Sequence, residues 1–513
     1  MADTAPTETP DRPEAYGDLL ESYRRVTNLN TAGGVLQWDQ EVMMPPGGTP
    51  ARAKQRSTLS ALSHEILTGD EVADALETLD QSSLDPAAAA NVREIRRQHE
   101  RAARVPSDLV EEISETSSEA FEVWQGAKEE SDWSRFEPIF ADLLDLKQQY
   151  AAHIDDTRDP YAVLFEDFEP YLGIDTAERV LDRLARELPP LIDDVRASNA
   201  DLADPFEGTY DPDAQEALSR ELLSDLDYDW DRGRLDRAPH PFSTGTQFDA
   251  RVTSRYRDED PLDGIMATVH EFGHASYTQG LPEDAYGTPL GESRDLSVHE
   301  SQSRFWENHV GRTEAFWDRH VSTMREHLGG PADATARDLY EAANQVYEDN
   351  TIRVEADELT YHMHIVLRFE IERDLLRGDL DVSAVPRVWN DKMEQYLGIV
   401  PEDDAAGCLQ DIHWSHGSIG YFPTYTLGSV LAAQLDHHLR ADLGDVDAMV
   451  RDGEFGPLRE WQREHVHRHG CRYTTPDLVR EATGEDYTAD YFLDHVESKF
   501  GDLYDLSARQ PTG

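Results

Sequence analysis

The segment His270-Glu271-Phe272-Gly273-His274 holds the residues of this chain that are best suited to metal chemistry. On a helix, residues four positions apart lie on one face, so the two histidines would direct their imidazoles at a point where a zinc ion can bind. Glu271 would lie beside that point, close enough to take a proton from a water molecule there. This H-E-x-x-H pattern is typical of metallohydrolases and predicts a metal, a base and a reaction type.

The residues around the motif predict a buried helix and not a solvated one. Asp260 and Pro261 suit the N-cap and the first helical position, and Gly280 suits the C-terminal end. An apolar strip runs between them, formed by Ile265, Met266, Val269, Phe272 and Gly273. Because buried polar groups need partners, histidines in such a helix are expected to bind a metal.

A third metal ligand is expected elsewhere in the chain, because a catalytic zinc ion usually has three protein ligands and one position for water. We predict that Glu300, on a second helix that returns towards the first, is this ligand. Two alternatives remain open. Ser297 to Glu300 also matches the S-x-x-E capping box, and His299 could itself bind the metal or orient a ligand.

Three further segments place polar side chains among apolar ones. They are His240–Phe242, Ile352–Asp357, and Gly407–Trp414 with Tyr421 and Tyr425 beyond it. The arginine of the second segment could form a structural ion pair, the histidines could be satisfied core groups, and the aromatic rings could serve packing alone. Periodicity does not decide between these roles and catalysis.

The net charge of the chain bears on which kinds of molecule it can bind. The 513 residues include 104 acidic and 47 basic side chains, a net charge of −57, which argues against nucleic acid as a partner. Only five of the basic residues are lysines, which leaves 42 arginines. Acidity spread along the whole chain, together with scarce lysine, predicts a protein adapted to a saline cytoplasm, where salt screens self-repulsion.

The location is expected to be cytoplasmic. The N-terminus lacks the basic and apolar regions of a secretory signal, and no apolar run approaches the roughly 20 residues of a membrane span. Cys408 and Cys471 are therefore expected to be reduced thiols and not a disulfide framework.

Most of the chain is predicted to be helical, with a small β-sheet beside the H-E-x-x-H helix. The sheet is expected near 248–256, with shorter extended pieces at 286–290 and 350–354. An N-terminal helical part, 1–200, would face a catalytic part, 201–513. Helical periodicity is clear at 14–28, 51–68, 86–104, 107–129, 134–152, 176–198, 213–225, 314–327, 334–347, 359–377 and 416–440.

Motifs along nearly the whole chain resemble, in order, those of the thermostable, Taq-type zinc carboxypeptidases. The motifs are Trp38-Asp39 with Met44-Pro45, His240-Pro241-Phe242, Asp249-x-Arg251-x-Thr253, His270-Glu271-Phe272-Gly273-His274, His299-Glu300-Ser301-Gln302-Ser303, Ile352–Asp357 and Gly407–Trp414. No motif position departs from the family pattern, and the acidity is consistent with a salt-adapted member.

This resemblance implies a fold, a site and an activity. It implies a mainly helical, zincin-like metallopeptidase, continuous as one domain, whose N-terminal part covers a deep cleft. It assigns one zinc ion per chain, or cobalt, to His270, His274 and Glu300, and it makes Glu271 the general base and acid. Arg353 matches the arginine that holds the substrate's terminal carboxylate. The resemblance further implies a cytosolic homodimer that removes many kinds of C-terminal residue and disfavours proline.

We therefore predict hydrolysis of the C-terminal peptide bond of peptides that carry a free carboxylate. His413, Tyr421 and Tyr425 are candidates for a second donor to the oxyanion, and Arg251 is the alternative to Arg353 as the carboxylate anchor. His240 is a further candidate for substrate binding. An oligopeptidase that cuts short peptides internally is the alternative enzyme. A non-catalytic metal-binding protein is disfavoured, because it would not need Glu271.

Overall fold

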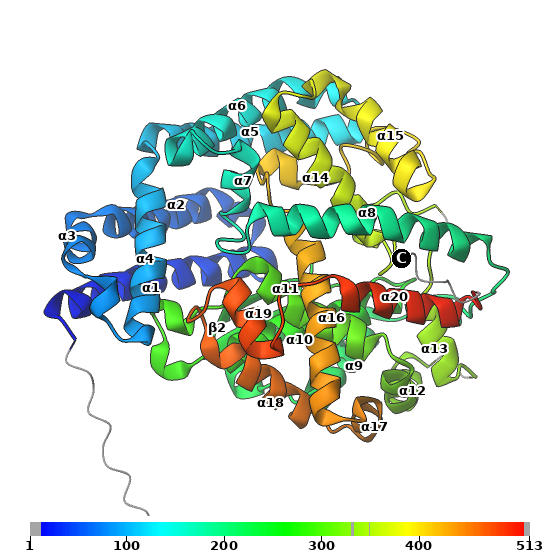
Figure 1. Ribbon diagram of the computed structural model, residues 1–513. Coiled ribbons are helices and arrows are strands. Elements are labelled where there is room, and N and C mark those ends of the chain that lie inside the picture. Colours follow the sequence, from blue (N-terminus) through cyan, green and yellow to red (C-terminus); the bar gives the residue numbers. More distant parts are fainter. Residues whose placement is uncertain (1–11, 330–332, 348, 507–513) are drawn as a thin grey trace, which may run out of the picture.

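The computed structural model describes residues 12–329, 333–347 and 349–506, and these are mostly helical (Figure 1). The helices are α1 (Glu14–Val42), α2 (Thr49–Thr68), α3 (Asp70–Thr78), α4 (Pro86–Arg104), α5 (Ser107–Glu130), α6 (Trp133–Asp155), α7 (Pro160–Phe165), α8 (Ile174–Ala197), α9 (Pro212–Asp225), α10 (Pro261–Gly280), α11 (Leu296–Arg304), α12 (Glu314–Leu328), α13 (Ala336–Ala343), α14 (Tyr361–Arg377), α15 (Val385–Leu397), α16 (Pro423–Leu443), α17 (Val446–Asp452), α18 (Gly456–His465), α19 (Thr475–Thr483) and α20 (Asp490–Leu503). Among the described residues, no helix combines the length and apolarity needed to cross a bilayer.

An Asp-Pro pair begins four of these helices, namely α4, α7, α9 and α10. In each, the aspartate is the N-cap and its carboxylate accepts a hydrogen bond from a backbone N–H of the first turn. The proline that follows has no N–H to satisfy and has a fixed φ that suits the first helical position. Local sequence therefore fixes where α10, the helix of the H-E-x-x-H motif, begins.

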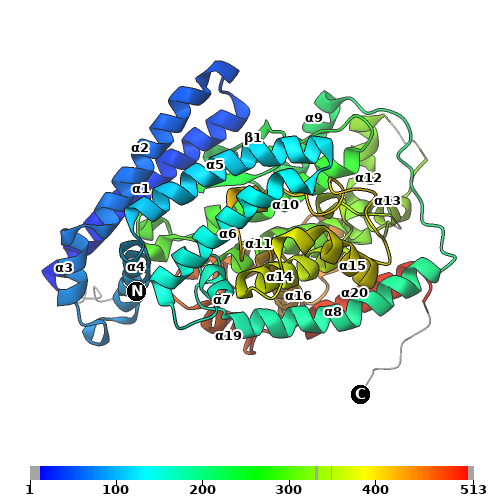
Figure 2. The same cartoon turned by 90° about the horizontal axis from the view of Figure 1, so that it is seen from above.

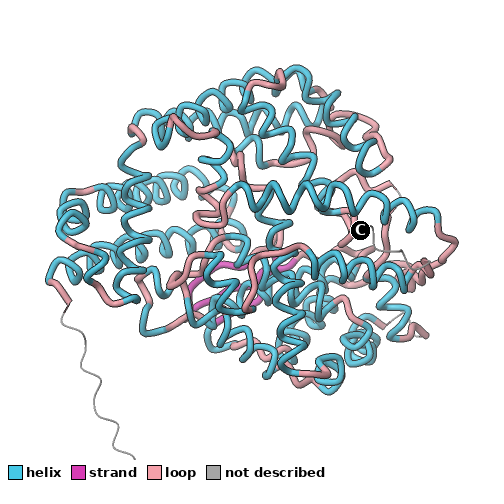
Figure 3. The backbone as a smooth tube through the Cα atoms, in the orientation of Figure 1, coloured by secondary structure: helices cyan, strands magenta, loops and turns pink. Residues whose placement is uncertain are grey.

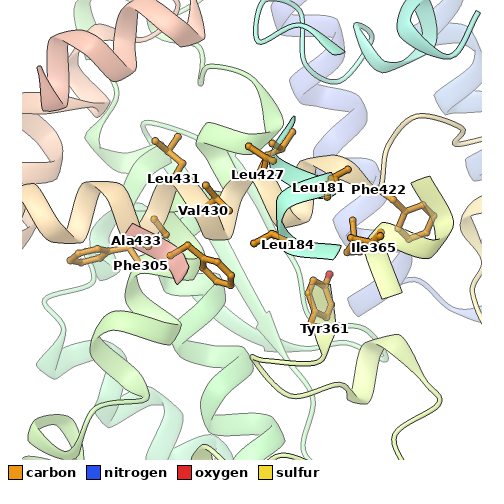
Figure 4. Packing of buried hydrophobic residues seen from close by; sticks show 14 of the residues in the cluster. Leu181, Leu184, Phe305, Tyr361, Ile365, Phe422, Leu427, Val430, Leu431 and Ala433 are labelled. Atoms are coloured by element: carbon orange, nitrogen blue, oxygen red, sulfur yellow. The ribbon is translucent and has the colours of Figure 1, made fainter. Parts of the chain in front are cut away.

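A single large hydrophobic cluster runs from α5 to α20. In the view of Figure 1, α5, α6, α14 and α15 lie above α8, whereas α10, α11 and α12 lie below it. Figure 4 shows side chains of three helices meeting in this cluster, with Leu181 of α8, Tyr361 and Ile365 of α14, and Leu427 and Val430 of α16. Burying such side chains supplies the main driving force that holds the helices together.

A second, smaller cluster joins α1, α3 and α4, with Tyr16, Leu19, Val72, Leu76 and Ile95 among its members. Figure 2 shows α1 and α2 running side by side and extending beyond the rest of the chain. Helices α5 to α8 belong to the larger cluster, together with the helices that follow residue 200. The division into parts 1–200 and 201–513 stays a prediction.

The small sheet contains β1 (Gly233–Arg237), β2 (Ser243–Thr246) and β3 (Asp249–Ser254) in the order β1-β3-β2. β3 pairs in parallel with β1 and antiparallel with β2, and it packs against α10 (Figure 3). The strand predicted at 248–256 and the sheet beside the motif helix are thus confirmed.

Four boundary predictions need correction. The extended pieces at 286–290 and 350–354 are not strands, because short 3₁₀ turns lie at Pro289–Gly291 and Arg353–Glu355. The helix predicted at 416–440 begins only at Pro423, after the 3₁₀ turn His413–His416. The helix predicted at 334–347 ends at Ala343.

Candidate metal centre

Helix α10 places His270 and His274 on one face, with their ring centroids 4.9 Å apart. Glu271 is buried beside them, and one ligand atom from each of the three residues lies within 4.8 Å of the other two. The four-residue spacing of the histidines on a regular helix is sufficient for this convergence. The convergence of His270, Glu271 and His274 that the motif predicts is therefore present in the folded chain.

Glu300 approaches the two histidines from α11. Its Oε2 atom lies 3.8 Å from His270 Nε2 and 3.5 Å from His274 Nε2. Ligand atoms that share a tetrahedral zinc ion at 2.0–2.2 Å are about 3.4 Å apart. The capping-box alternative does not apply, because Asp295 is the N-cap of α11 and the Ser297 hydroxyl donates to Glu169.

Two glycines allow Glu300 to reach this position. A Cβ atom on Gly273 of α10 would lie 2.5 Å from the Gln302 carbonyl oxygen of α11, and a Cβ on Gly428 of α16 would lie 2.5 Å from Cβ and Cγ of Glu300. The three helices therefore cross at distances that only glycine permits. Gly280 has a similar role at the end of α10, where a Cβ would lie 2.2 Å from the His467 ring.

The side chains present fit a zinc ion. Two histidines and a glutamate are a known set of zinc ligands that leaves one coordination position open. Within the described residues, Glu271 Oε2 and His274 Nδ1 are buried without any hydrogen-bond partner. Buried polar atoms are rarely left unpaired, and a base that must accept a proton needs a free oxygen. Burial raises the pKa of Glu271 above its ordinary value.

A second carboxylate, Glu307, orients His270. Its Oε2 atom lies 2.8 Å from His270 Nδ1, so the opposite nitrogen, Nε2, is presented to Glu300 and the metal position. Glu307 lies in the π-helical turn Phe305–Gly311 that continues α11. Such π-helical turns recur at functional sites. Glu307 is not among the predicted site residues, because neither helical periodicity nor the S-x-x-E pattern before it gives any sign of a π-helical turn.

Arg304 joins the two carboxylates of the centre. It donates to Glu300 Oε1 at 2.8 Å and to Glu307 Oε2 at 3.1 Å, while Arg312 donates to Glu307 Oε1 at 3.0 Å. Burial raises the pKa of the Glu300 and Glu307 carboxyls, but Arg304 and the neighbouring imidazoles together outweigh it, with Arg312 adding to the effect at Glu307. Both pKa values therefore lie well below the ordinary value. Glu300 is therefore held as the charged carboxylate that a metal ligand must be.

Arg353 lies in a second polar cluster with Asp411. Its Nε donates to Asp411 Oδ2 at 2.5 Å, its Nη1 donates to the Tyr361 hydroxyl at 3.0 Å, and its backbone N–H donates to Gln410 at 2.8 Å. The other Asp411 oxygen is 2.6 Å from His413 Nδ1. Motifs more than fifty residues apart thus meet in one buried group.

Tyr361 connects the two clusters. The Arg304 guanidinium lies over its ring at 4.9 Å, and its hydroxyl accepts the hydrogen bond from Arg353. The sequence-predicted residues Tyr421 and Tyr425 lie nearby, with ring centroids 5.2 Å apart, and the Tyr425 hydroxyl is 3.4 Å from His413 Nε2. The structure therefore brings Arg353, His413, Tyr421 and Tyr425 together.

The remaining candidates occupy other positions. Arg251 on β3 is paired with Asp249 at 2.6 Å and lies over the Trp38 ring at 4.2 Å, contacts that suit a structural ion pair. His240 is exposed and has no hydrogen bond or ion pair within the described residues. His299 stacks on His274 with centroids 4.5 Å apart, and burial lowers its pKa to about 3.

Comparison with known proteins identifies the family. Residues 18–500 match the model of the family described as carboxypeptidase Taq (M32) metallopeptidase. The chain is 39% identical to thermostable carboxypeptidase 1 of Thermus thermophilus over 516 residues, covering 96% of this chain and 99% of that protein. The protein of the same name from Pyrococcus furiosus is 37% identical, with 95% and 98% covered.

A solved structure agrees with this match. The crystal structure of the M32 carboxypeptidase from Deinococcus radiodurans aligns with a TM-score of 0.92 and 35% identity, over 96% of this chain and all of that one. The chain therefore belongs to the carboxypeptidase Taq (M32) metallopeptidase family. The helical fold, the family and the enzyme class predicted from the sequence, a metallocarboxypeptidase, are thereby confirmed.

Proposed function

We propose that this metallocarboxypeptidase uses one zinc ion, held by His270, His274 and Glu300, to release single amino acids from peptide C-termini. The observation that carries the proposal is the convergence of two imidazole nitrogens and a charged carboxylate beside the unpaired Glu271 oxygen. The same ligand types also accept cobalt, so metal content has to be measured on the protein itself.

Glu271 would serve as both base and acid. A bound zinc ion supplies Lewis acidity, which polarises the scissile carbonyl and lowers the pKa of water. The free Oε2 of Glu271 accepts a proton from the attacking water and then delivers it to the leaving amine. Burial raises the pKa of Glu271, which moves it towards the neutral range where one group can both accept and donate a proton.

Arg353 would anchor the substrate's terminal carboxylate. Its Nε and Nη1 already donate to Asp411 and Tyr361, whereas Nη2 donates no hydrogen bond within the described residues. Asp411 and Tyr361 fix the guanidinium, so that little side-chain freedom is lost on binding. Tyr361 places this anchor one side chain away from Arg304 and the metal centre, as required for cleavage of the last peptide bond.

The oxyanion of the tetrahedral intermediate needs a donor besides the metal. We propose that Tyr421, Tyr425 or His413 supplies it, since all three surround Arg353. His413 Nδ1 is turned to Asp411, which leaves Nε2 on the side of the Tyr425 hydroxyl.

The anchor is tested with a pair of peptides that differ only in a free or amidated C-terminus. For Arg353→Met we expect KM for the free acid to rise at least tenfold and the preference for the free acid to disappear, because the bidentate partner of the carboxylate is lost. Arg373→Met in α14, where the arginine pairs with Glu178 at 3.1 Å, is the matched control.

Equal losses on the acid and the amide would instead assign Arg353 a structural role. The same digests identify the products. Single C-terminal residues support the proposal, whereas internal fragments would indicate an oligopeptidase.

We further propose the setting implied by the chain's composition and family. The enzyme would act in a saline cytoplasm as a homodimer, with a deep cleft covered by residues 1–200, broad residue preference and poor cleavage beside proline. The net charge of −57 supports the saline setting, because salt screens repulsion between surface carboxylates.

A further inference from the structure

Arg368 of α14 is fully buried and lies in a cage of aromatic rings. Its guanidinium carbon is 4.4 Å from the centroid of Phe422, 4.8 Å from Trp389 and 5.0 Å from Trp414. None of its three guanidinium nitrogens has a hydrogen-bond partner within the described residues. A cation over aromatic faces is attracted to them, but rings do not replace the hydrogen bonds of water.

Arg368 shares its ion-pair partner, Asp411, with Arg353. Its Nη2 is 3.6 Å from Asp411 Oδ2, the same oxygen that accepts a hydrogen bond from Arg353 at 2.5 Å. No other carboxylate lies within 4.0 Å of either guanidinium in the parts of the chain that the structure describes. Two guanidinium groups therefore share one carboxylate, which leaves a buried surplus of one positive charge.

Neighbouring groups offset this surplus only in part. Lys128 donates to the Gln410 carbonyl at 2.7 Å and adds a further positive charge beside Asp411. His364 is buried, and burial lowers its pKa to about 3, so it is neutral. Glu372 accepts from Trp414 Nε1 at 2.8 Å, and burial raises its pKa to about 7, so it is only partly ionised at neutral pH.

Stability does not explain a cation at this position. A buried charge with one shared partner and no hydrogen bonds costs desolvation energy, and apolar replacements of buried ion pairs are often neutral or stabilising. Asp411 would still be paired with Arg353 and His413 if Arg368 were absent. The surplus is also unusual for a chain with 104 acidic and 47 basic residues.

We propose that Arg368 is a positioning residue that enables Arg353 to bind the substrate's terminal carboxylate. Its charge makes the group formed by Arg353, Asp411 and Arg368 positive overall. The inference rests on the proposed role of Arg353 as the anchor. Without Arg368, the charge of Arg353 would be cancelled by Asp411, and the pair would attract a carboxylate only weakly. With Arg368, an incoming carboxylate completes a group of two cations and two anions.

Arg368→Met tests this role, because methionine removes the charge and still fills the aromatic cage. A unit charge about 10 Å away at an effective dielectric constant of about 20 changes binding roughly tenfold. We therefore expect KM for a free-acid peptide to rise about tenfold or more, with kcat changed less than about threefold and kcat/KM for the amide nearly unchanged. The melting temperature should not fall.

Two further variants complete the experiment. Arg368→Lys keeps the charge, so KM should stay within about threefold of the wild-type value. Arg373→Met repeats the substitution five residues along the same helix, where the guanidinium lies over Phe369 and pairs with Glu178, and it should leave KM unchanged.

The inference and the proposed function fail in different ways. A normal free-acid KM in Arg368→Met, with Arg353→Met still abolishing the preference for the acid, would overturn the inference and leave the anchor intact. A lower melting temperature with equal losses on acid and amide would make Arg368 structural. If Arg353→Met itself kept the preference, the proposed anchor would be wrong before Arg368 came into question.

Discussion

His270 and His274 have different surroundings although they occupy equivalent positions on α10. The His270 ring is held by Glu307 through Nδ1, whereas His274 Nδ1 has no partner within the described residues and its ring stacks on His299. A hydrogen bond on one nitrogen fixes which nitrogen faces the metal and increases its basicity. His270 is therefore the proposed ligand whose geometry depends on one identifiable side chain.

Replacing Glu307 with glutamine keeps the shape of the side chain and removes its charge. Loss of such a hydrogen-bonded carboxylate typically weakens metal binding 10- to 100-fold, and we expect Glu307→Gln to lower zinc affinity by about that factor. Competition with a chelator measures the affinity, and Glu314→Gln, whose carboxylate lies 3.6 Å from Arg337, is the control. Wild-type zinc affinity in Glu307→Gln would mean that Glu307 only neutralises Arg304 and Arg312.

Some of these residues could be predicted from sequence and others could not. The two histidines and Glu271 follow from helix geometry, since a spacing of four residues fixes the face on which they lie. Glu307 reaches the site because it lies in a π-helical turn. Asp411 reaches it because the fold brings the segment around residue 411 back to Arg353. Local periodicity carries no information on either feature, and Asp411 entered only as part of a longer motif.

Among the elements, the crossing of α10, α11 and α16 positions Glu300, the proposed third ligand. Glycine at 273 and 428 lets the backbones approach until Glu300 lies within 3.8 Å of both imidazoles. The sequence predicts a packing role for Gly273 on an apolar strip, and the partner of this glycine in the structure is the backbone of α11. The role of Gly428 is visible only in the assembled fold.

Gly273→Ala should separate α10 from α11. The new methyl group would lie 2.5 Å from backbone atoms of Gln302 and Ser303, and a backbone cannot yield as a flexible side chain can. We expect a loss of roughly 1–3 kcal/mol in stability together with weaker zinc binding, measured by denaturant unfolding and by chelator competition.

The control for this substitution is Gly33→Ala in α1, where a Cβ meets nothing within 4 Å and alanine favours the helix. A Gly273→Ala protein with normal stability and normal zinc affinity would show that the helices adjust without displacing Glu300.

At the scale of the whole molecule, the hydrophobic core holds the helices together, whereas the net charge governs how the chain responds to salt. Two hydrophobic clusters hold the helices, and acidic side chains predominate in the chain as a whole. Fold class followed from periodicity, and the start of α10 followed from its Asp-Pro pair, because these signals are local. Some helix limits did not follow. The helix predicted at 14–28 continues to Val42, and the end of α13 and the start of α16 also differ from the prediction, because tertiary packing decides how far a helix continues.

A net charge of −57 predicts a strong dependence of stability on salt. In dilute buffer the carboxylates repel one another over about 30 Å at 0.01 M, and this range shrinks to about 3 Å at 1 M. We expect the free energy of unfolding to rise steeply with KCl concentration, followed by circular dichroism. Full stability in dilute buffer would contradict the proposed saline setting.

The central claim is that His270, His274 and Glu300 hold zinc while Glu271 moves the proton, and Glu271→Gln tests it most directly. Zinc content and the release of the C-terminal amino acid from a blocked dipeptide are measured on the same preparation. The account predicts about one zinc ion per chain and a rate lowered by roughly 10²- to 10⁴-fold, because the ligands remain and the base is lost. Unchanged turnover, or loss of zinc together with activity, would contradict it.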